Sequence, residues 1–396
     1  MSDLKIFTDN IEPEALDQIY TLVKQPAFAD CKVRIMPDCH AGKGCVIGFT
    51  ADLGDKVIPN IVGVDIGCGM YTVRLGKVSI DFEKLDEVIR TSIPHGHDIH
   101  PERVVSFPRV NDLKCYPHLK NKGRFENAIG SLGGGNHFIE IDKDEEDNHY
   151  LIIHSGSRNL GKQVADYYQN LAIEILHEKG NLPEMKKRLI EEYKAAGKQK
   201  EIQKALKELE RTYRPSGTKI PKELCYLEDK NREDYLHDMA ICQDYADLNR
   251  KTMANLILER MNLKPLSSFS TIHNYIDLET NIVRKGAIRA KKDEIVLIPM
   301  NMRDGCIIAK GKGNEDWNES APHGAGRLMS RSKAKETLSL EEFKETMKGI
   351  YTTCVNTFTL DESPMAYKPM GEILSYIQDT VDIVQIIKPV YNFKSN

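Results

Sequence analysis

Residues 150–158 read YLIIHSGSR, an apolar run that ends in a histidine and then in small and polar residues. Short β-branched runs closed by a turn-like cluster are typical of β-strands. The first 160 residues contain further runs of this kind: KVRIM (32–36), CVIGFTA (45–51) and NIVGVDI (60–66). They predict a β-rich core in which one buried strand ends at His154. Alternatively, His154 is an ordinary core histidine whose ring nitrogens are hydrogen-bonded within the core.

The periodicity changes between about Gly161 and Asn262. Apolar residues recur there at near-helical spacing among dense charges, which predicts amphipathic helices. Strand-like sequence returns with AIRAKKDEIVLIPM (287–300), and the chain ends as a helix followed by a terminal strand. Because β-rich sequence stands on both sides of the helical part, we predict an α+β fold with one large domain over residues 1–396. Its β-rich core carries the candidate site, and residues 161–262 form a helical insertion within it.

Composition narrows the class of protein. With 396 residues, 40% of them hydrophobic, the chain can bury a sizeable core, and a net charge of -4 argues against a protein coated in positive charge. The N-terminus lacks the apolar region of a signal peptide, and no stretch approaches the roughly 20 apolar residues that span a bilayer. The nine cysteines show no framework spacing. We therefore predict a cytoplasmic protein without a membrane partner.

Potential metal ligands stand at or beside the ends of several strand-like runs. They are Asp65 and Cys68 in GVDIGCGM (63–70), His137 in SLGGGNHFIE (131–140), His154, and His273 in STIHNYID (270–277). Each alone could be an ordinary core residue. Together, one carboxylate, one thiolate and three imidazoles suit manganese, iron, cobalt or zinc better than magnesium or calcium. Because these residues are scattered over about 200 positions, the whole fold must assemble the site, which favours a catalytic role over a compact structural one.

A further histidine, His323, lies in SAPHGAGR (320–327) between a proline and two glycines. Spacing alone leaves it as a loop residue, a metal ligand or a nucleophile. Basic residues occur in the same neighbourhoods, among them Arg158, Lys285 and Arg327. Metals, arginines and glycine loops together indicate phosphate chemistry, because the charge on phosphate oxygens must be neutralised by fixed cations.

Eight motifs, in order along essentially the whole chain, resemble those of the RtcB family of RNA-splicing ligases. They are MPDCHAGKG, GVDIGCGM, LGGGNHFIE, HSGSRNLG, HNY, RKGA, PHGAGR and DESPMAYK. The resemblance implies an enzyme that uses GTP and manganese to join an RNA 3'-phosphate or 2',3'-cyclic phosphate end to a 5'-hydroxyl end. It also implies a histidine-GMP intermediate on His323 and an activated RNA-3'-pp-G end.

The resemblance assigns roles residue by residue. Asp65, Cys68, His137, His154 and His273 would bind two Mn²⁺ ions, with the Cys68 thiolate shared between them. Arg158, Lys285 and Arg327 would hold phosphates, and Asp38 would be a supporting acid. Asn136 would contact a phosphate or a metal-bound group, and Phe138, Glu140, Tyr367 and Lys394 would bind guanine.

One stretch departs from the family pattern. Where better-known members carry a Gly-Ser-Met-Gly type sequence that helps to bind the nucleotide, this chain has PMNMRDGC (299–306). Either Arg303, Asp304 and Gly305 substitute for that sequence or the nucleotide is handled differently.

Two other functions stay open from the sequence. One is a guanylyltransferase that caps 3'-phosphate ends of RNA or DNA without efficient sealing, and the other is a non-catalytic nucleic-acid or nucleotide binding protein. The biological RNA (a spliced tRNA or a damaged RNA under repair) and the need for an activating protein partner are open as well.

Overall fold

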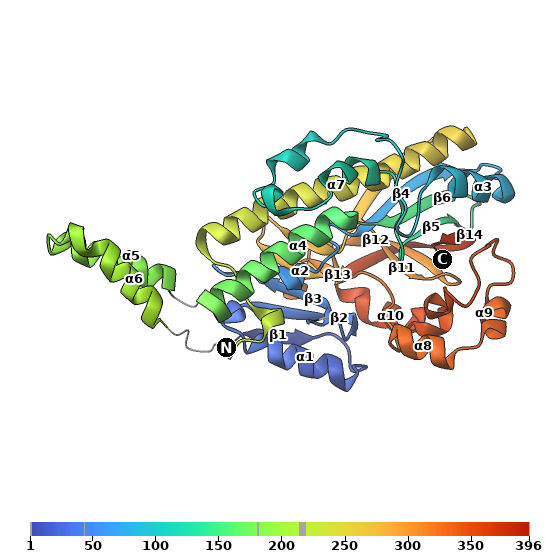
Figure 1. Cartoon of the computed structure of the whole chain (residues 1–396). Coiled ribbons are helices and arrows are strands. Elements are labelled where there is room, and N and C mark those ends of the chain that lie inside the picture. Colours follow the sequence, from blue (N-terminus) through green and yellow to red (C-terminus); the bar gives the residue numbers. More distant parts are fainter. Residues whose placement is uncertain (1, 43, 180–181, 214–218, 396) are drawn as a thin grey trace.

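The computed structural model describes residues 2–42, 44–179, 182–213 and 219–395, and it has the predicted α+β character (Figure 1). Its strands are β1 (Asp3–Ile6), β2 (Lys32–His40), β3 (Ile47–Asp52), β4 (Gly69–Gly76), β5 (Phe138–Lys143), β6 (His149–Ser155), β7 (Ser267–Ile272), β8 (Asn274–Asp277), β9 (Ile282–Lys285), β10 (Ala287–Arg289), β11 (Ile295–Asn301), β12 (Gly305–Gly311), β13 (Ser320–Pro322) and β14 (Val381–Lys394). Its α-helices are α1 (Pro13–Val23), α2 (Pro59–Val62), α3 (Phe82–Ser92), α4 (Arg158–Ile173), α5 (Leu182–Ala195), α6 (Ile202–Thr212), α7 (Asp229–Met261), α8 (Arg331–Thr337), α9 (Leu340–Thr346) and α10 (Met370–Tyr376).

Two sheets form the core of the described chain. The larger has the order β11-β12-β14-β5-β6-β4-β7, and every neighbouring pair in it is antiparallel. Its first and last strands approach each other, since the backbone N–H of Leu297 on β11 donates to Thr271 Oγ1 on β7 at 3.2 Å. The sheet is therefore almost closed on itself. The smaller sheet has the order β1-β2-β3-β9-β8, and a short β10-β13 ribbon lies beside the two.

The two faces of the large sheet differ in character, as the period of two along a strand requires. On β5, Ile139 and Ile141 face outward and join a hydrophobic cluster with α3 and α7. The alternate residues Phe138, Glu140 and Asp142 face the interior, where Phe138 packs with Met70, Ile152, Leu297 and Ile308. The interior of the nearly closed sheet thus combines apolar packing with buried carboxyl groups.

The antiparallel order brings distant residues to one end of the large sheet. Cys68 and His137 directly precede β4 and β5, whereas His154 lies at the end of β6 and His273 directly follows β7. Because neighbouring strands run in opposite directions, the beginnings of β4 and β5 coincide with the ends of β6 and β7. The end of β14, which carries Lys394, pairs with the beginning of β5 at Phe138. The topology therefore gathers candidate ligands and the candidate nucleotide residues at the same edge.

One predicted strand is wrong. The run NIVGVDI contains helix α2 and a loop, because Pro59 at the first helical position fixes a helical φ and Gly63, with φ of 92°, ends the helix. Asp65 therefore lies in a loop between α2 and β4, and the main chain at Cys68 is held there by its N–H bond to the Asp65 carbonyl at 3.2 Å.

Helix α7 runs across the outer face of the large sheet and contacts β4 and β6 (Figure 1). Two of its residues, Asn249 and Arg250, are fully buried. Asn249 Oδ1 accepts from the backbone N–H groups of Gly130 and Ser131, and its Nδ2 donates to the carbonyls of Ser131 and Gly156. Arg250 Nη1 donates to the carbonyls of Gly67 and Ser155 at 2.7 and 2.8 Å. This pair fastens the three loops that precede or follow Cys68, His137 and His154.

Helices α5 and α6 pack against each other and project from the rest of the molecule (Figure 1). Of their side chains whose exposure is described, none is buried. At the base of this hairpin, His177 Nε2 lies 2.9 Å from the carbonyl of Ile220, so the two chain segments leading to it are close together. The predicted helical insertion over 161–262 thus contains two kinds of helix: α4 and α7 contribute to the core, while α5 and α6 do not.

None of the helices in the described ranges combines the length and the apolarity needed to cross a membrane. In the same ranges, all nine cysteines are buried and none is paired in a disulfide.

Replacing residues 182–212 with a short Gly/Ser linker should leave the fold intact. We expect the melting temperature to change by no more than about 3 °C, because none of the deleted side chains whose exposure is described is buried. Thermal unfolding followed by circular dichroism measures the change. Ile257→Ala in α7 is the matched control and should lower the melting temperature clearly, since it empties a fully buried position. A large loss of stability in the deletion variant would show that the hairpin belongs to the core.

Candidate functional site

Three predicted metal ligands converge at the end of the large sheet. Cys68 Sγ lies 3.3 Å from His154 Nε2 and 3.5 Å from His137 Nε2, and all three side chains are buried. Asp65 Oδ2 lies 3.0 Å from His137 Nε2, which adds a carboxylate to the group. The ends of β4, β5 and β6 thus bring Asp65, Cys68, His137 and His154 together.

Hydrogen bonds to the backbone set the orientation of both imidazoles. His137 Nδ1 lies 2.9 Å from the carbonyl of Leu132, and His154 Nδ1 lies 3.1 Å from the carbonyl of Asn136. A carbonyl only accepts, so each Nδ1 is assigned as the N–H donor and each Nε2 carries a lone pair. Those lone pairs point at a thiol sulfur and a carboxylate oxygen. Acceptor atoms that converge in this way can bind a cation between them.

The electrostatics of the group also fit a bound cation. Burial, and next the Asp65 carboxylate, raise the pKa of the Cys68 thiol well above its usual value. Burial lowers the pKa values of His154 and His273 and keeps both rings neutral. Burial opposes the ionisation of Asp65, but its contacts with His137, with the Cys68 thiol and with the backbone N–H of Ser157 together outweigh burial and lower the pKa of Asp65. Neutral imidazoles and a carboxylate are ready ligands, and a coordinated cation would offset the cost of a buried thiolate.

His273 connects this group to His323. Its ring centroid lies 5.2 Å from that of His154 and 4.9 Å from that of His323. Its Nδ1 is buried and has no hydrogen-bonding partner, which is an uncommon state for a buried polar atom. The backbone holds the residue between the sheets, because its N–H donates to the Cys68 carbonyl and its own carbonyl accepts from Gly286.

His323 is bound to Asp38. Its Nδ1 lies 2.6 Å from Asp38 Oδ2, and the same oxygen accepts the backbone N–H groups of His323 and Gly324 at 3.0 and 3.2 Å. Asp38 is fully buried on β2, and the His323 side chain is 18% exposed. With Nδ1–H directed at a carboxylate, the lone pair of His323 is on Nε2. The loop can approach this closely because Gly326 has φ of 75° and a Cβ there would meet the Asp38 carbonyl at 2.3 Å.

A cavity of about 610 Å³ opens beside His323. Predicted site residues line it, namely Asn136, Phe138, Glu140, His154, His323, Arg327, Tyr367 and Lys394. His154 places the metal-type group at one side of the cavity, and all four residues predicted to bind guanine lie on the cavity wall.

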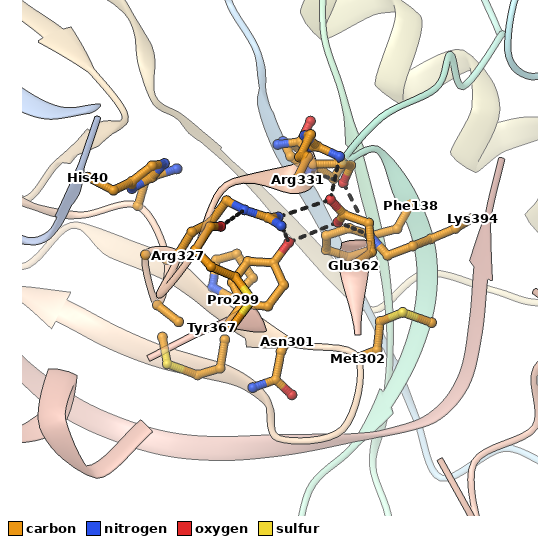
Figure 2. A pocket seen from close by; sticks show the side chains of 18 of the residues that line it. His40, Phe138, Pro299, Asn301, Met302, Arg327, Arg331, Glu362, Tyr367 and Lys394 are labelled. Atoms are coloured by element: carbon orange, nitrogen blue, oxygen red, sulfur yellow. Dashed lines mark hydrogen bonds and ion pairs between the residues drawn. The ribbon is translucent and has the colours of Figure 1, made fainter. Parts of the chain in front are cut away.

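The centre of the cavity wall is a buried carboxylate, Glu362. Figure 2 shows four side chains directed at it. Its oxygens lie 2.7 Å from Arg331 Nη1, 2.9 Å from Lys394 Nζ, 2.9 Å from Tyr367 Oη and 3.4 Å from Arg327 Nη1. Burial opposes its ionisation, but Lys394 and Arg331, followed by Arg327, lower the pKa of Glu362 to about 2. Glu362 thus fixes three cations around the cavity.

Arg158 and Lys285 are not on the cavity wall. Arg158 begins α4 with φ of 55°, and its guanidinium donates to Ser131 Oγ and to the Gly96 carbonyl. A Cβ at Gly133 would lie 1.9 Å from Arg158 Nη1, so this glycine of the triple-glycine loop is required by the packing of Arg158. Lys285 is buried, donates to the Asn60 carbonyl at 2.9 Å, and its pKa is lowered by burial. A phosphate role for either residue stays a prediction.

The departure PMNMRDGC covers the end of β11, the turn that follows it and the start of β12. Arg303 is paired with Asp304 at 2.8 Å. Pro299, Asn301 and Met302 (Figure 2), and also Gly305, line the cavity. Of the three residues expected to substitute for the family stretch, only Gly305 is at the cavity.

The sequence interpretation assigned no role to Glu362, Arg331, Asn249 or Arg250. Glu362 lies in the motif DESPMAYK, and its place in that motif could have identified it as a site residue. Asn249 and Arg250 lie within a long helical pattern whose periodicity says nothing about polar side chains that bind loops from three strands.

Glu362→Gln should destabilise the protein in a pH-dependent way. A pKa of about 2 in the folded protein, against the usual 4.5 of a glutamate side chain, corresponds to a stabilisation on the order of 3 kcal/mol that is present above pH 4.5 and is lost as pH falls through 2. Urea unfolding over a pH series measures the free-energy difference between wild type and variant. Exposed Glu341→Gln is the control. A difference that does not shrink between pH 4.5 and 2 would contradict this electrostatic account.

The comparisons with known proteins agree with this geometry. The family model described as tRNA-splicing ligase RtcB matches residues 18–114 and 112–395. RNA-splicing ligase RtcB of Escherichia coli strain K12 is 31% identical over 422 residues, covering 96% of this chain and 94% of the relative. tRNA-splicing ligase RtcB of Aeropyrum pernix is 27% identical over 474 residues, covering 93% of this chain and 89% of the relative. With a family model that matches nearly the whole chain, and with candidate ligands converging beside His323, the chain belongs to the RtcB family.

Proposed function

We propose that this protein is a GTP-dependent RNA ligase that joins RNA 3'-phosphate or 2',3'-cyclic phosphate ends to 5'-hydroxyl ends. The observation that carries the proposal is the His323–Asp38 pair, which stands between a metal-type cluster and a cavity lined by cations. Membership in a family of RNA-splicing ligases supports RNA as the substrate.

His323 is suited to nucleophilic attack. Asp38 holds Nδ1–H, so Nε2 presents its lone pair and the carboxylate stabilises the positive charge that develops on the ring. In the first step, Nε2 forms a bond to the α-phosphorus of GTP, the bond from that phosphorus to the bridging oxygen breaks, and pyrophosphate leaves. The product is a phosphoramidate of GMP on His323.

Two further displacements complete the reaction. An oxygen of the RNA 3'-phosphate attacks the phosphorus of the adduct and expels His323, which forms RNA-3'-pp-G. The 5'-hydroxyl of the second strand then attacks the RNA 3'-phosphorus and releases GMP, which leaves a phosphodiester. A cyclic phosphate end is first hydrolysed to the 3'-phosphate.

Asp65, Cys68, His137, His154 and His273 would hold manganese ions. Bound there, the ions would supply positive charge to the phosphates and orient them for in-line attack. The chain's own contribution is to keep His154 and His273 neutral and to orient His137 and His154 through the carbonyls of Leu132 and Asn136.

The cavity favours guanine. A carboxylate such as Glu140 offers two acceptors, which match the N1–H and 2-amino donors of guanine, whereas adenine presents a lone pair at N1. Phe138 supplies an aromatic face, and Lys394 lies 5.2 Å from the centroid of its ring. Arg327 and Arg331 bring fixed positive charge to the same wall.

We place the reaction in the cytoplasm, which the nine buried, unpaired cysteines support.

The decisive experiment incubates the protein with GTP labelled at the α-phosphate and with manganese. We expect an acid-labile protein-GMP adduct in the wild type and in the control His118→Ala. His323→Ala should form none, and Asp38→Asn should form the adduct at least about 100-fold more slowly, because the imidazole loses the carboxylate that sets its tautomer. Gel electrophoresis and autoradiography measure the adduct.

RNA strands ending in 3'-phosphate and 5'-hydroxyl, added next, test the later steps. A sealed product is the expected result. An adduct followed by a capped but unsealed strand would replace ligation with end capping, and a wild type that forms no adduct would refute the proposed chemistry altogether.

Removing the central thiol should weaken metal binding independently of activity. We expect Cys68→Ala to raise the dissociation constant for manganese by at least about tenfold, the size of effect that loss of a supporting residue alone produces. Equilibrium dialysis with elemental analysis measures bound manganese. Cys31→Ala, which changes a buried thiol in a separate part of the core, is the control. Equal binding by Cys68→Ala would exclude Cys68 as a ligand.

A further inference from the structure

Three acidic groups meet inside the nearly closed sheet, behind the cavity. Glu140 and Asp142 face inward from β5, and Cys306 faces them from β12. Potential ligand atoms of the three side chains lie within 4.8 Å of one another, and all three residues are buried. Only Glu140 among them lines the cavity.

Their hydrogen bonds are distributed unequally. Glu140 Oε2 accepts from Asn392 Nδ2 on β14, and Glu140 Oε1 lies 3.8 Å from the Cys306 thiol. Neither oxygen of Asp142 has a donor, although the residue has no exposed surface. An ionised carboxylate in that state would lose its hydration without compensation.

One proton shared between Glu140 and Asp142 would remove the cost of burying two negative charges side by side. Ligand atoms of Asp142 and Glu140 lie within 4.8 Å of each other, and two carboxylates this close in an apolar interior do not both ionise. Burial, and next the Glu140 carboxylate, raise the pKa of Asp142 well above its usual value. Burial raises the pKa of Glu140 too, but hydrogen bonds with Asp142 and Asn392 and the charge of Lys394 oppose the rise. The proton therefore resides on Asp142 and the charge on Glu140.

We propose that Asp142 is a positioning residue for the nucleotide base: its protonated carboxyl group donates a hydrogen bond to Glu140 and holds Glu140 ionised, with its acceptors presented to the cavity. The inference rests on the proposed function, because it concerns the purine nucleotide that the cavity binds. It assigns to Asp142 a part in choosing a base with donors at N1 and C2.

The surroundings of the pair contain few other titratable groups. From β12 the neighbour is the Cys306 thiol, whose pKa is raised by burial, and from β14 it is the Lys394 ammonium. From β6, Tyr150 pairs with Asp142 across the strands, but its hydroxyl donates to Asp144 at 3.1 Å. Asn392, which is neutral, supplies the remaining contact.

The first test compares nucleotides. Binding of GTP and of inosine triphosphate, which lacks the 2-amino group, is measured with manganese for wild type, Asp142→Asn and Asp142→Leu. We expect Asp142→Leu to weaken GTP binding by about tenfold or more and to lower the preference for GTP, because Glu140 loses its donor. Asp142→Asn should keep the preference, because its amide can donate in place of the acid proton. Asp147→Asn, at the exposed turn between β5 and β6, is the matched control.

The pH dependence separates positioning from packing. As pH rises and Asp142 loses its proton, two adjacent negative charges should weaken GTP binding in the wild type, whereas Asp142→Asn has no proton to lose and should resist that decline. If Asp142→Leu keeps the wild-type preference, or if the profiles of wild type and Asp142→Asn coincide, Asp142 has no positioning role.

A second test needs no nucleotide. The infrared difference spectrum between wild type and Asp142→Asn at neutral pH should contain the carbonyl band of a protonated carboxyl group, and its absence would overturn the inference. This readout distinguishes the two proposals. A wild type that shows the band but forms no GMP adduct refutes the guanylylation chemistry alone, while an adduct without the band refutes the shared proton alone.

Discussion

The site depends on the hydrogen bonds that Asn249 and Arg250 make from the buried side of α7. The loops at Gly67, Gly130 and Ser155 contain glycines and short polar residues, which by themselves prefer no single conformation. Their backbone carbonyls and N–H groups are satisfied by one amide and one guanidinium. Because a buried backbone group without a partner is costly, each loop is held in the one conformation that reaches these side chains. The candidate metal ligands next to those loops are oriented as a result.

Antiparallel topology explains how one edge collects chemistry from the whole chain. Each strand contributes either its beginning or its end to that edge, and His154 and Lys394 face the interior there because both pair with the inward-facing Phe138. The second sheet then adds Asp38 from β2, which reaches His323 beyond β13. The proposed nucleophile His323 and the carboxylate that orients it therefore come from different parts of the core, and their 2.6 Å contact depends on how the sheets pack.

Much of this arrangement was predictable from the sequence, and the exceptions have physical reasons. Cys68, His137, His154 and His273 were predicted as candidate ligands because each lies at or beside the end of a strand-like run, a pattern that is visible in the local sequence. Proline and glycine overrode the strand pattern at Pro59–Val62. The motifs did not reveal the direction of long side chains: Arg158 donates to Ser131 and Gly96 in other loops, and Arg303 turns to Asp304. Glu362 and Asp142 acquire their significance only from neighbours far away in sequence.

The position of β14 has a consequence for how the protein is made. This last strand lies in the middle of the large sheet, between β12 and β5, and it ends at Lys394. A chain emerging from the ribosome lacks the strand that joins the two halves of its sheet until β14 has been made, so the interior that carries Glu140 cannot close before then. Pairing of β5 with β14 spans most of the chain length, a kind of contact that forms slowly. A chain without β14 therefore exposes apolar strand edges, and it needs protection from aggregation until that strand is in place.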